Sequence, residues 1–214
     1  MTVTEALLAF GLVAGLLTIV PGLDTALVLR GTLTRSRRYG FAAASGIQAG
    51  TLVWGAAAAT GAAALLAASQ TAYRVLTVLG AAYMVWLGVS MLWRSARAPS
   101  RDVAQPEAVQ IAADRTGQGF GMGLVTNLTN PKVGVFYVAT IPQFVPDGVS
   151  PLVMGLALAA VHCALGALWL SAVIVGAGRL APRLHASGAV RWVDRVTGGV
   201  LVALGVRLAA SARA

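Results

Sequence analysis

The chain alternates long apolar runs with gaps that hold most of its charged residues, and this alternation restricts what it can fold into more than any other feature. A helix needs about 20 mostly apolar residues to cross the ~30 Å hydrocarbon layer of a bilayer. Six runs meet that length, at residues 6–29, 41–68, 75–93, 120–141, 152–176 and 192–210. Only 11% of the residues are charged, which is too few to cover a globule of this size with a wetted surface. The sequence therefore predicts an all-α, polytopic membrane protein with six transmembrane helices in a lipid bilayer.

The basic residues predict how these helices are oriented. There are 16 Lys and Arg against 7 Asp and Glu, and twelve of the 16 lie in the first, third and fifth gaps or just beside them. The twelve are Arg30, Arg35, Arg37, Arg38, Arg94, Arg97, Arg101, Arg115, Arg179, Arg183, Arg191 and Arg195. Cytoplasmic loops carry the excess of Lys and Arg, so both termini are expected to face outward. Because Arg and Ala predominate, as in bacteria with GC-rich genomes, we expect the protein in a bacterial inner (cytoplasmic) membrane.

Composition argues against several other classes. No basic patch is interleaved with aromatic residues, so a nucleic-acid partner is not expected. Cys163 is the only cysteine, which rules out a disulfide or a redox pair within the chain. The runs hold too few carboxylates, imidazoles and thiols for a dehydrated divalent cation, and there is no Walker-type phosphate loop. We therefore expect no bound metal, no cofactor and no enzymatic reaction.

One long gap divides the chain into two groups of three runs. Residues 94–119 mix proline with charges of both signs and are predicted to be a cytoplasmic linker between a first repeat at 1–93 and a second at 120–214. Since three is odd, corresponding helices of the two repeats run in opposite directions. Pro21 and Pro131 stand 110 positions apart in matching runs, and a Leu-Gly-Val step recurs at 87–89 and 204–206. The pattern favours two inverted three-helix repeats, an architecture of many secondary transporters.

Pro21, Gly22 and Pro131 are expected to break the first and fourth helices. A proline inside a helix removes one backbone donor, so the carbonyls of Leu17 and Asn127 should lose their helical partners. Each break also gives the half-helix that follows it a positive N-terminus of its own.

Asp24 and Lys132 lie inside apolar runs, each just after the proline of its half. A charged side chain at the membrane centre costs about 3 kcal/mol or more, so each needs a physical reason to be there. The positive end of a half-helix suits Asp24, which could serve only as a helix cap, but it repels Lys132. Lys132 therefore needs an anionic partner. That partner is either Asp24, in a salt bridge between the halves, or a ligand carboxylate.

This pair of charges suits a zwitterionic ligand. Lys132 beside a helix N-terminus fits a carboxylate, and Asp24 fits an ammonium group. The further candidates for substrate binding are the neutral hydrogen-bonding residues Thr18, Gln48, Asn127 and Asn130. Proton coupling is assigned to Asp24 and to His162, which lies near the middle of the fifth run. The alternative for His162 is a neutral imidazole bonded to a backbone carbonyl.

Two pairs of glycines predict close helix contacts. Gly46 and Gly50 are four residues apart, as are Gly119 and Gly123. This spacing lets the backbones of neighbouring helices approach closely in a membrane, although it does not by itself indicate dimerisation.

These elements resemble the LysE/RhtB family of bacterial amino-acid exporters. The resemblance rests on residues 21–24 (Pro-Gly-Leu-Asp), 130–132 (Asn-Pro-Lys) and 79–88 with its Gly-Ala-Ala-Tyr step, and it extends over nearly the whole chain. Leu23 stands where the family usually has a second proline. The resemblance implies export of amino acids or close derivatives, driven by the proton-motive force, with Asp24 and residues 130–132 lining the path.

The expected function is therefore secondary active export of amino acids. No second carboxylate lies deep in the runs to pair with a cationic side chain, which favours neutral substrates over lysine or arginine. A passive channel or a metal-ion permease is the alternative. A thiol-relay oxidoreductase shares the inverted arrangement but needs paired cysteines. The expected partners are an amino acid, protons and the bilayer. A homo-oligomer is compatible with the sequence, which does not determine the number of subunits.

Overall fold

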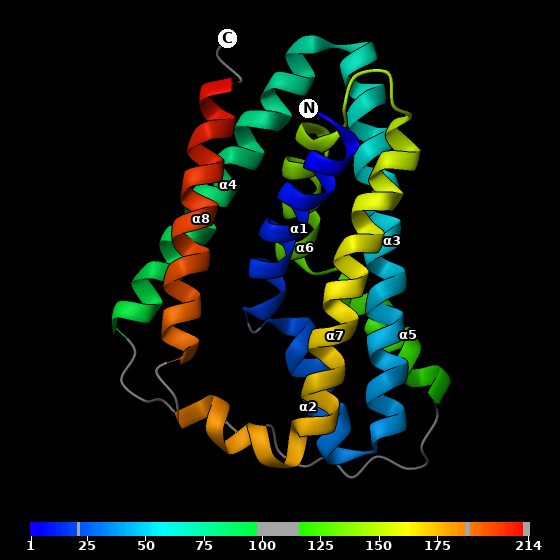
Figure 1. Ribbon diagram of the computed structural model, residues 1–214, viewed down its shortest axis with the longest axis vertical. Coiled ribbons are helices and arrows are strands. Elements are labelled where there is room, and N and C mark those ends of the chain that lie inside the picture. Colours follow the sequence, from blue (N-terminus) through cyan, green and yellow to red (C-terminus); the bar gives the residue numbers. More distant parts are fainter. Residues whose placement is uncertain (21, 98–115, 187–188, 212–214) are drawn as a thin grey trace.

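The computed structural model describes residues 1–20, 22–97, 116–186 and 189–211, and the elements in these ranges are helices (Figure 1). In chain order they are α1 (Val3–Ile19), α2 (Leu23–Thr34), α3 (Arg37–Ala68), α4 (Gln70–Arg97), α5 (Thr116–Leu128), α6 (Pro131–Thr140), the short 3-10 helix η1 (Ile141–Phe144), α7 (Pro151–Ala186) and α8 (Ala189–Ser211). The all-α prediction is confirmed for these ranges. Most of the expected linker, residues 98–115, lies outside them.

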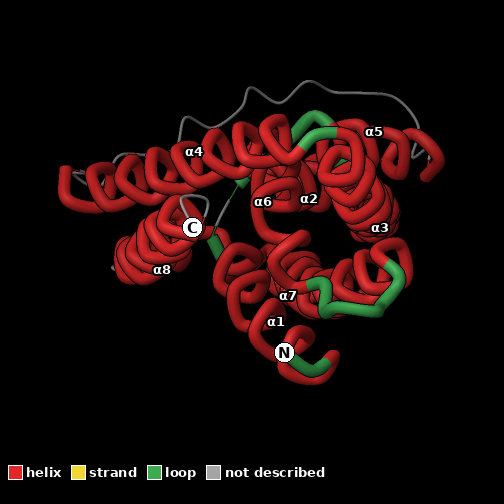
Figure 2. Tube along the Cα trace, turned by 90° about the horizontal axis from the view of Figure 1, so that it is seen from above, coloured by secondary structure: helices red, strands yellow, loops and turns green. Residues whose placement is uncertain are grey.

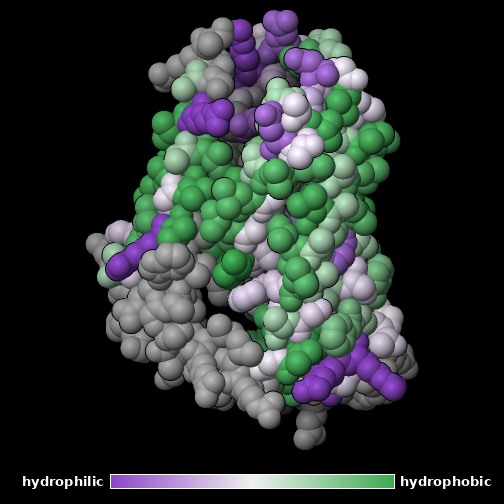
Figure 3. Space-filling model, in the orientation of Figure 1, coloured by the Kyte–Doolittle hydropathy of each residue, from purple (hydrophilic) through white to green (hydrophobic). Residues whose placement is uncertain are grey.

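Several helices have the length and composition of membrane spans. In the described part, α3, α4 and α7 qualify, and α1 with α2 counts as a fourth span if the pair, bent by 51°, is taken as one. Large apolar side chains such as Leu8, Leu12 and Leu168 are each at least 70% exposed. Figure 3 shows apolar residues over the middle of the molecule and polar residues toward its ends. The chain is a polytopic membrane protein, whereas the count of six spans stays a prediction.

The helices run roughly along one axis and form a bundle. The start of α1 and the end of α8 lie at the same end of the molecule, and α2 lies at the other (Figure 1). Seen along the bundle, α4 and α8 pack together on one side, while α2 and α6 lie between α4 and the helices α1, α3 and α7 (Figure 2). The two half-helix pairs therefore meet inside the bundle.

The fourth run breaks where its proline predicts. α5 ends at Leu128 and α6 begins at Pro131, where a residue without an N–H loses no helical hydrogen bond. Asn130 caps α6, because its Oδ1 accepts a hydrogen bond of 3.1 Å from the backbone N–H of Lys132.

The first run breaks in a corresponding way. α1 ends at Ile19, and α2 begins at Leu23 with Gly22 as an extended N-cap that makes no side-chain cap hydrogen bond. Pro21, the predicted cause of this break, lies outside the described residues.

The glycine pairs lie at the contact between α3 and α5, as the spacing predicts. A Cβ on Gly123 would meet the backbone of Ala43, and a Cβ on Gly50 would lie 2.6 Å from Asn127 Oδ1. Two further crossings were not singled out in the sequence. Gly55 meets Gly155 between α3 and α7, and Gly88 meets Gly198 between α4 and α8. Close backbone contact thus brings helices of the two halves together at three places.

Valine substitutions on α5 test this packing. Gly123→Val forces a branched side chain into the α3 backbone, which should cost about 1–3 kcal/mol and lower the apparent melting temperature in detergent by about 2–12 °C. Gly121→Val is the matched control, because a Cβ there meets nothing within 4 Å. Equal melting temperatures for the two variants would contradict the close contact.

Candidate substrate site

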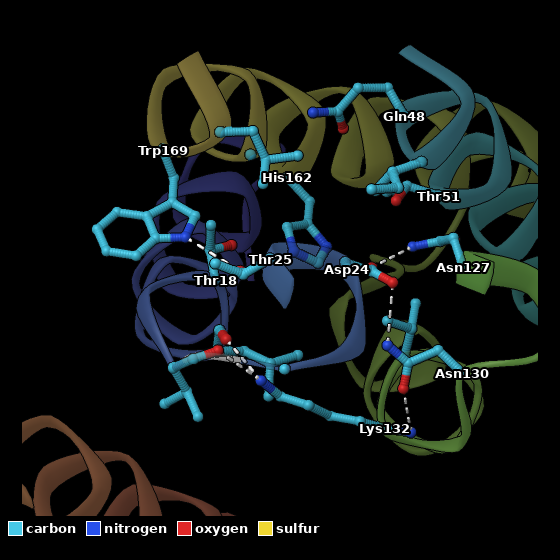
Figure 4. A pocket seen from close by; sticks show the side chains of 17 residues that line it. Thr18, Asp24, Thr25, Gln48, Thr51, Asn127, Asn130, Lys132, His162 and Trp169 are labelled. Atoms are coloured by element: carbon cyan, nitrogen blue, oxygen red, sulfur yellow. Dashed lines mark hydrogen bonds between the residues drawn. The ribbon is translucent and has the colours of Figure 1, made fainter. Parts of the chain in front are cut away.

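Polar residues from both halves line one cavity of about 60 Å³ between the two helix breaks (Figure 4). A water-sized group needs about 10–15 Å³ on this measure, so the cavity holds a few such groups. The predicted site residues that line it are Thr18, Gly22, Asp24, Gln48, Asn127, Asn130, Lys132 and His162. The structure thus brings these candidates together. That they bind substrate or protons stays a prediction.

Asp24 links the two halves through its carboxylate. Oδ2 accepts a hydrogen bond of 2.8 Å from Asn127 Nδ2, and Oδ1 accepts one of 3.2 Å from Asn130 Nδ2. The residue stands in the first turn of α2, where the helix dipole favours a negative charge, as the cap alternative supposed. Its side-chain hydrogen bonds, however, cross to the second half of the chain.

Lys132 makes the reciprocal link. Its Nζ donates hydrogen bonds to the carbonyl oxygens of Leu17, at 3.0 Å, and Val20, at 3.1 Å. These atoms are at the C-terminal end of α1, where the dipole is negative. The expectation of an anionic partner was therefore incomplete. Backbone oxygens bind the ammonium group, and the charge also interacts electrostatically with Asp24.

The carbonyls of Leu17 and Asn127, which the prolines were expected to leave without helical partners, accept hydrogen bonds from other donors. The Leu17 oxygen binds Lys132, as described. The Asn127 oxygen accepts from the Trp54 indole Nε1, at 3.3 Å, and from the Asn130 backbone N–H, at 3.1 Å. Trp54 was not predicted from the sequence, because an aromatic residue in an apolar run is usually a packing or lipid-facing side chain.

Two buried polar atoms in the cavity have no hydrogen-bond partner among the described residues. They are Gln48 Nε2, a donor, and Asn127 Oδ1, an acceptor. The Gln48 amide lies over Gly166 of α7, where a Cβ would be 3.0 Å from Nε2. A buried polar atom without a partner costs about 1–3 kcal/mol. Two residues of the cavity lining therefore each hold one hydrogen-bonding atom without a partner among the described residues.

Two other candidate site residues already make hydrogen bonds within the protein. The Thr18 hydroxyl donates to the Ala14 carbonyl of its own helix, at 2.7 Å. His162, which is 9% exposed, lies with Nδ1 2.9 Å from the hydroxyl of Tyr137. Its hydrogen-bond partner is thus a side chain and not the backbone carbonyl of the alternative interpretation.

Several lining residues were missed in the sequence. Trp169 Nε1 donates to Thr25 Oγ1 at 3.3 Å, and Thr51 also faces the cavity. Helical spacing could have found two of them, since Trp169 follows His162 by seven positions and Thr51 follows Gln48 by three.

A second hollow of about 490 Å³ lies on the other side of Asn130, between α4 and the break of α5 and α6. It is lined by Pro131, by Gly80 and Tyr83 of the Gly-Ala-Ala-Tyr step in residues 79–88, and by leucine and valine side chains. It is mostly apolar, so the hydrogen-bonding groups remain concentrated in the first cavity.

The fold and the cavity define a class of protein. Two broken helices meet inside a helical membrane bundle, and their ends surround a cavity lined by both polar and apolar side chains, as in secondary transporters. In the described part of the chain, no three His, Cys, Asp or Glu residues are grouped so as to hold a metal ion.

Comparison with known proteins identifies the family. Residues 16–212 match the LysE type translocator model, and the chain belongs to this family. It is a transporter and not an enzyme. An uncharacterised membrane protein of Pseudomonas aeruginosa is 35% identical over 200 residues, which are 89% of this chain and 88% of that protein.

Some relatives carry names that state a function, and two of these are compared with the chain below. The threonine efflux protein of Escherichia coli is 29% identical over 129 residues, 60% of this chain and 61% of that protein. The leucine efflux protein of Enterobacter sp. is 33% identical over 127 residues, 59% of this chain and 57% of that protein. The matched segment thus spans about three fifths of these two relatives. No solved structure matches the chain.

Replacing Lys132 tests its link to α1. Lys132→Met leaves the Leu17 and Val20 carbonyls without their charged donor, which should cost about 1.5–3 kcal/mol and lower the apparent melting temperature by about 3–12 °C. Arg74→Met removes a positive charge from an exposed position and serves as the control. If both variants melt like the wild type, the ammonium group does not stabilise the end of α1.

Replacing Gln48 tests the unpaired amide. Gln48→Met keeps the length of the side chain and removes a buried donor without a partner, so stability should rise by about 1 kcal/mol, or about 2–4 °C. Gln143→Met is the comparison, because that amide donates to the Ala139 carbonyl at 2.6 Å and should gain nothing. A fall in the melting temperature of Gln48→Met would mean that the amide is satisfied.

Proposed function

We propose that the protein is a secondary active transporter that exports neutral amino acids from the cytoplasm, driven by the proton-motive force. The observation that carries the proposal is the cavity at the two helix breaks. Its lining includes the Asp24 carboxylate and the amides of Gln48 and Asn127, each of which has one atom without a hydrogen-bond partner among the described residues. The threonine and leucine efflux relatives support an amino-acid substrate.

An amino acid would bind with its ammonium group at Asp24 and Asn127 Oδ1 and its carboxylate at Gln48 Nε2. This orientation is supported by the opposite charges of the ammonium group and the Asp24 carboxylate, and by the amide atoms of Gln48 and Asn127 that have no partner among the described residues. A whole amino acid has more atoms than the cavity of about 60 Å³ holds, so binding requires the surrounding helices to separate. Lys132 would then be free to leave the α1 carbonyls and reach the substrate carboxylate.

The lining favours a neutral side chain. Among the described residues that line the cavity, Asp24 is the one acidic group, and the ammonium group of the substrate already requires it. Ile47, Val133 and Leu170 offer apolar surface beside it. Binding a cationic side chain would leave its charge unpaired, which costs far more than burying an apolar one.

The architecture of the proposed exporter is six membrane helices in two inverted repeats. In this arrangement α1–α2 corresponds to α5–α6, α3 to α7 and α4 to α8. This arrangement is supported by the two corresponding helix breaks, which lie between Ile19 and Leu23 and between Leu128 and Pro131. The basic end that includes Arg30, Arg37 and Arg38 would face the cytoplasm of a bacterium, with both termini outside its inner membrane.

Transport in inverted membrane vesicles tests the function. The vesicles are energised, and uptake of labelled threonine, leucine and lysine is followed with and without a protonophore. We expect uptake of threonine or leucine that the protonophore abolishes, and little uptake of lysine. Uptake that the protonophore leaves unchanged would favour the passive channel, and proton-dependent uptake of lysine would contradict the neutral preference.

Asp24→Asn should lower that uptake by about 10–100-fold at matched expression, because it removes a charge-assisted contact of about 1.5–3 kcal/mol. Asp147→Asn, in the exposed loop after η1, is the control for loss of an acidic residue. Unchanged uptake by the Asp24 variant would leave that carboxylate as a helix cap.

A further inference from the structure

We propose that Tyr137 is a positioning residue that holds His162 so that one imidazole nitrogen exchanges the coupled proton with the cavity. The proposal rests on the proton-driven export proposed above and adds the residues that carry the proton. Tyr137 is fully buried on α6 and is not among the residues that line the cavity.

The geometry separates the two nitrogens of His162. Nδ1 lies 2.9 Å from the Tyr137 hydroxyl, and the two rings are stacked with centroids 5.7 Å apart and planes at 16°. Figure 4 shows the imidazole projecting from α7 into the cavity on the side of Thr25 and Asp24. With Nδ1 held by the tyrosine, Nε2 is the nitrogen left to face the cavity.

Aromatic side chains enclose the rest of the imidazole. Phe10 and Phe136 pack against it edge-on, with centroids 6.4 Å and 6.1 Å away, and Phe144 packs on Phe10. These rings offer neither a proton donor nor a proton acceptor. Within the described contacts, a proton on Nε2 therefore enters and leaves through the cavity.

The hydrogen bond between Tyr137 and His162 determines which tautomer of the imidazole can take up a proton from the cavity. When Nδ1–H donates to the tyrosine oxygen, Nε2 keeps its lone pair and can form an N–H bond with a proton from the cavity. The resulting imidazolium still donates from Nδ1 to the same oxygen and returns the Nε2 proton to the cavity. The net reaction is gain or loss of one proton at Nε2, with the Tyr137 hydroxyl unchanged.

The charged and titratable groups around His162 come from three helices. Asp24 on α2 and Lys132 on α6 share the cavity with it, and Cys163 is its neighbour on α7. Helices α1 and α3 contribute the neutral side chains Phe10 and Gln48. Lys132 and a protonated His162 repel each other, so the proton would weaken the hold of Lys132 at the end of α1. Proton binding would in this way favour the separation that substrate binding requires.

Nitrogen NMR tests the geometry without depending on transport. The chain has two histidines, so His185→Gln leaves His162 as the single signal in protein labelled with ¹⁵N-histidine and reconstituted in lipid. We expect the neutral imidazole to be the Nδ1–H tautomer. Adding Tyr137→Phe should mix the tautomers and move the titration midpoint by about one pH unit, the equivalent of one hydrogen bond. An unchanged tautomer and midpoint would overturn the positioning role.

Proteoliposome transport tests the coupling. Exchange of labelled for unlabelled substrate needs no net proton movement, whereas accumulation driven by a pH gradient does. We expect Tyr137→Phe to keep exchange within about twofold and to lose accumulation by about tenfold, and we expect His162→Gln to lose accumulation as well. Tyr83→Phe, on α4 in the second hollow, is the control and should retain both activities.

The outcomes separate the two proposals. Equal loss of exchange and accumulation in Tyr137→Phe would make that residue structural, and wild-type accumulation in both variants would exclude both residues from coupling. If the wild type exchanges neither threonine nor leucine, the proposed substrate class fails. The tautomer measurement still decides whether Tyr137 positions His162.

Discussion

Each broken helix in this protein is completed by side chains from the other half of the chain, and the rest of the structure depends on that exchange. A backbone carbonyl without a donor costs several kcal/mol inside a membrane. Lys132 from the second half binds the carbonyls at the end of α1, while the amides of Asn127 and Asn130 bind the carboxylate of Asp24 from the first. The two charges are therefore stable in the bundle because each lies beside a helix end of suitable polarity.

The cavity is a consequence of the same arrangement. The helix breaks bring polar side chains of both halves together, and among the described residues Gln48 Nε2 and Asn127 Oδ1 have no hydrogen-bond partner. Close glycine contacts, such as Gly55 on Gly155, bring the surrounding helices near enough to bury these groups. A ligand that occupied the cavity would compete with the contacts that join the halves. Binding and helix movement are thus linked through the same few atoms.

Much of this could be predicted from the sequence because the bilayer imposes strong requirements. A span must be long and apolar, a charge within it needs a partner, and a proline removes one known donor. These rules placed Asp24, Gln48 and Lys132 in one site and located the break at Pro131. They did not find the acceptors of Lys132, because backbone oxygens have no residue signature. They also missed Trp54, whose hydrogen bond to the Asn127 carbonyl depends on a neighbouring helix.

The sequence by itself determined the class of protein, the apolar helices, the helix break at Pro131 and the residues that need polar surroundings, since these follow from local composition and from the absence of water in the membrane. The tertiary structure decided which partner each group has. Whether Lys132 meets a carboxylate or a helix end, and whether His162 meets the backbone or Tyr137, depends on how helices distant in the chain cross. Those crossings depend on how the faces of apolar helices pack against one another, and the hydrophobic periodicity of the sequence does not distinguish one apolar face from another.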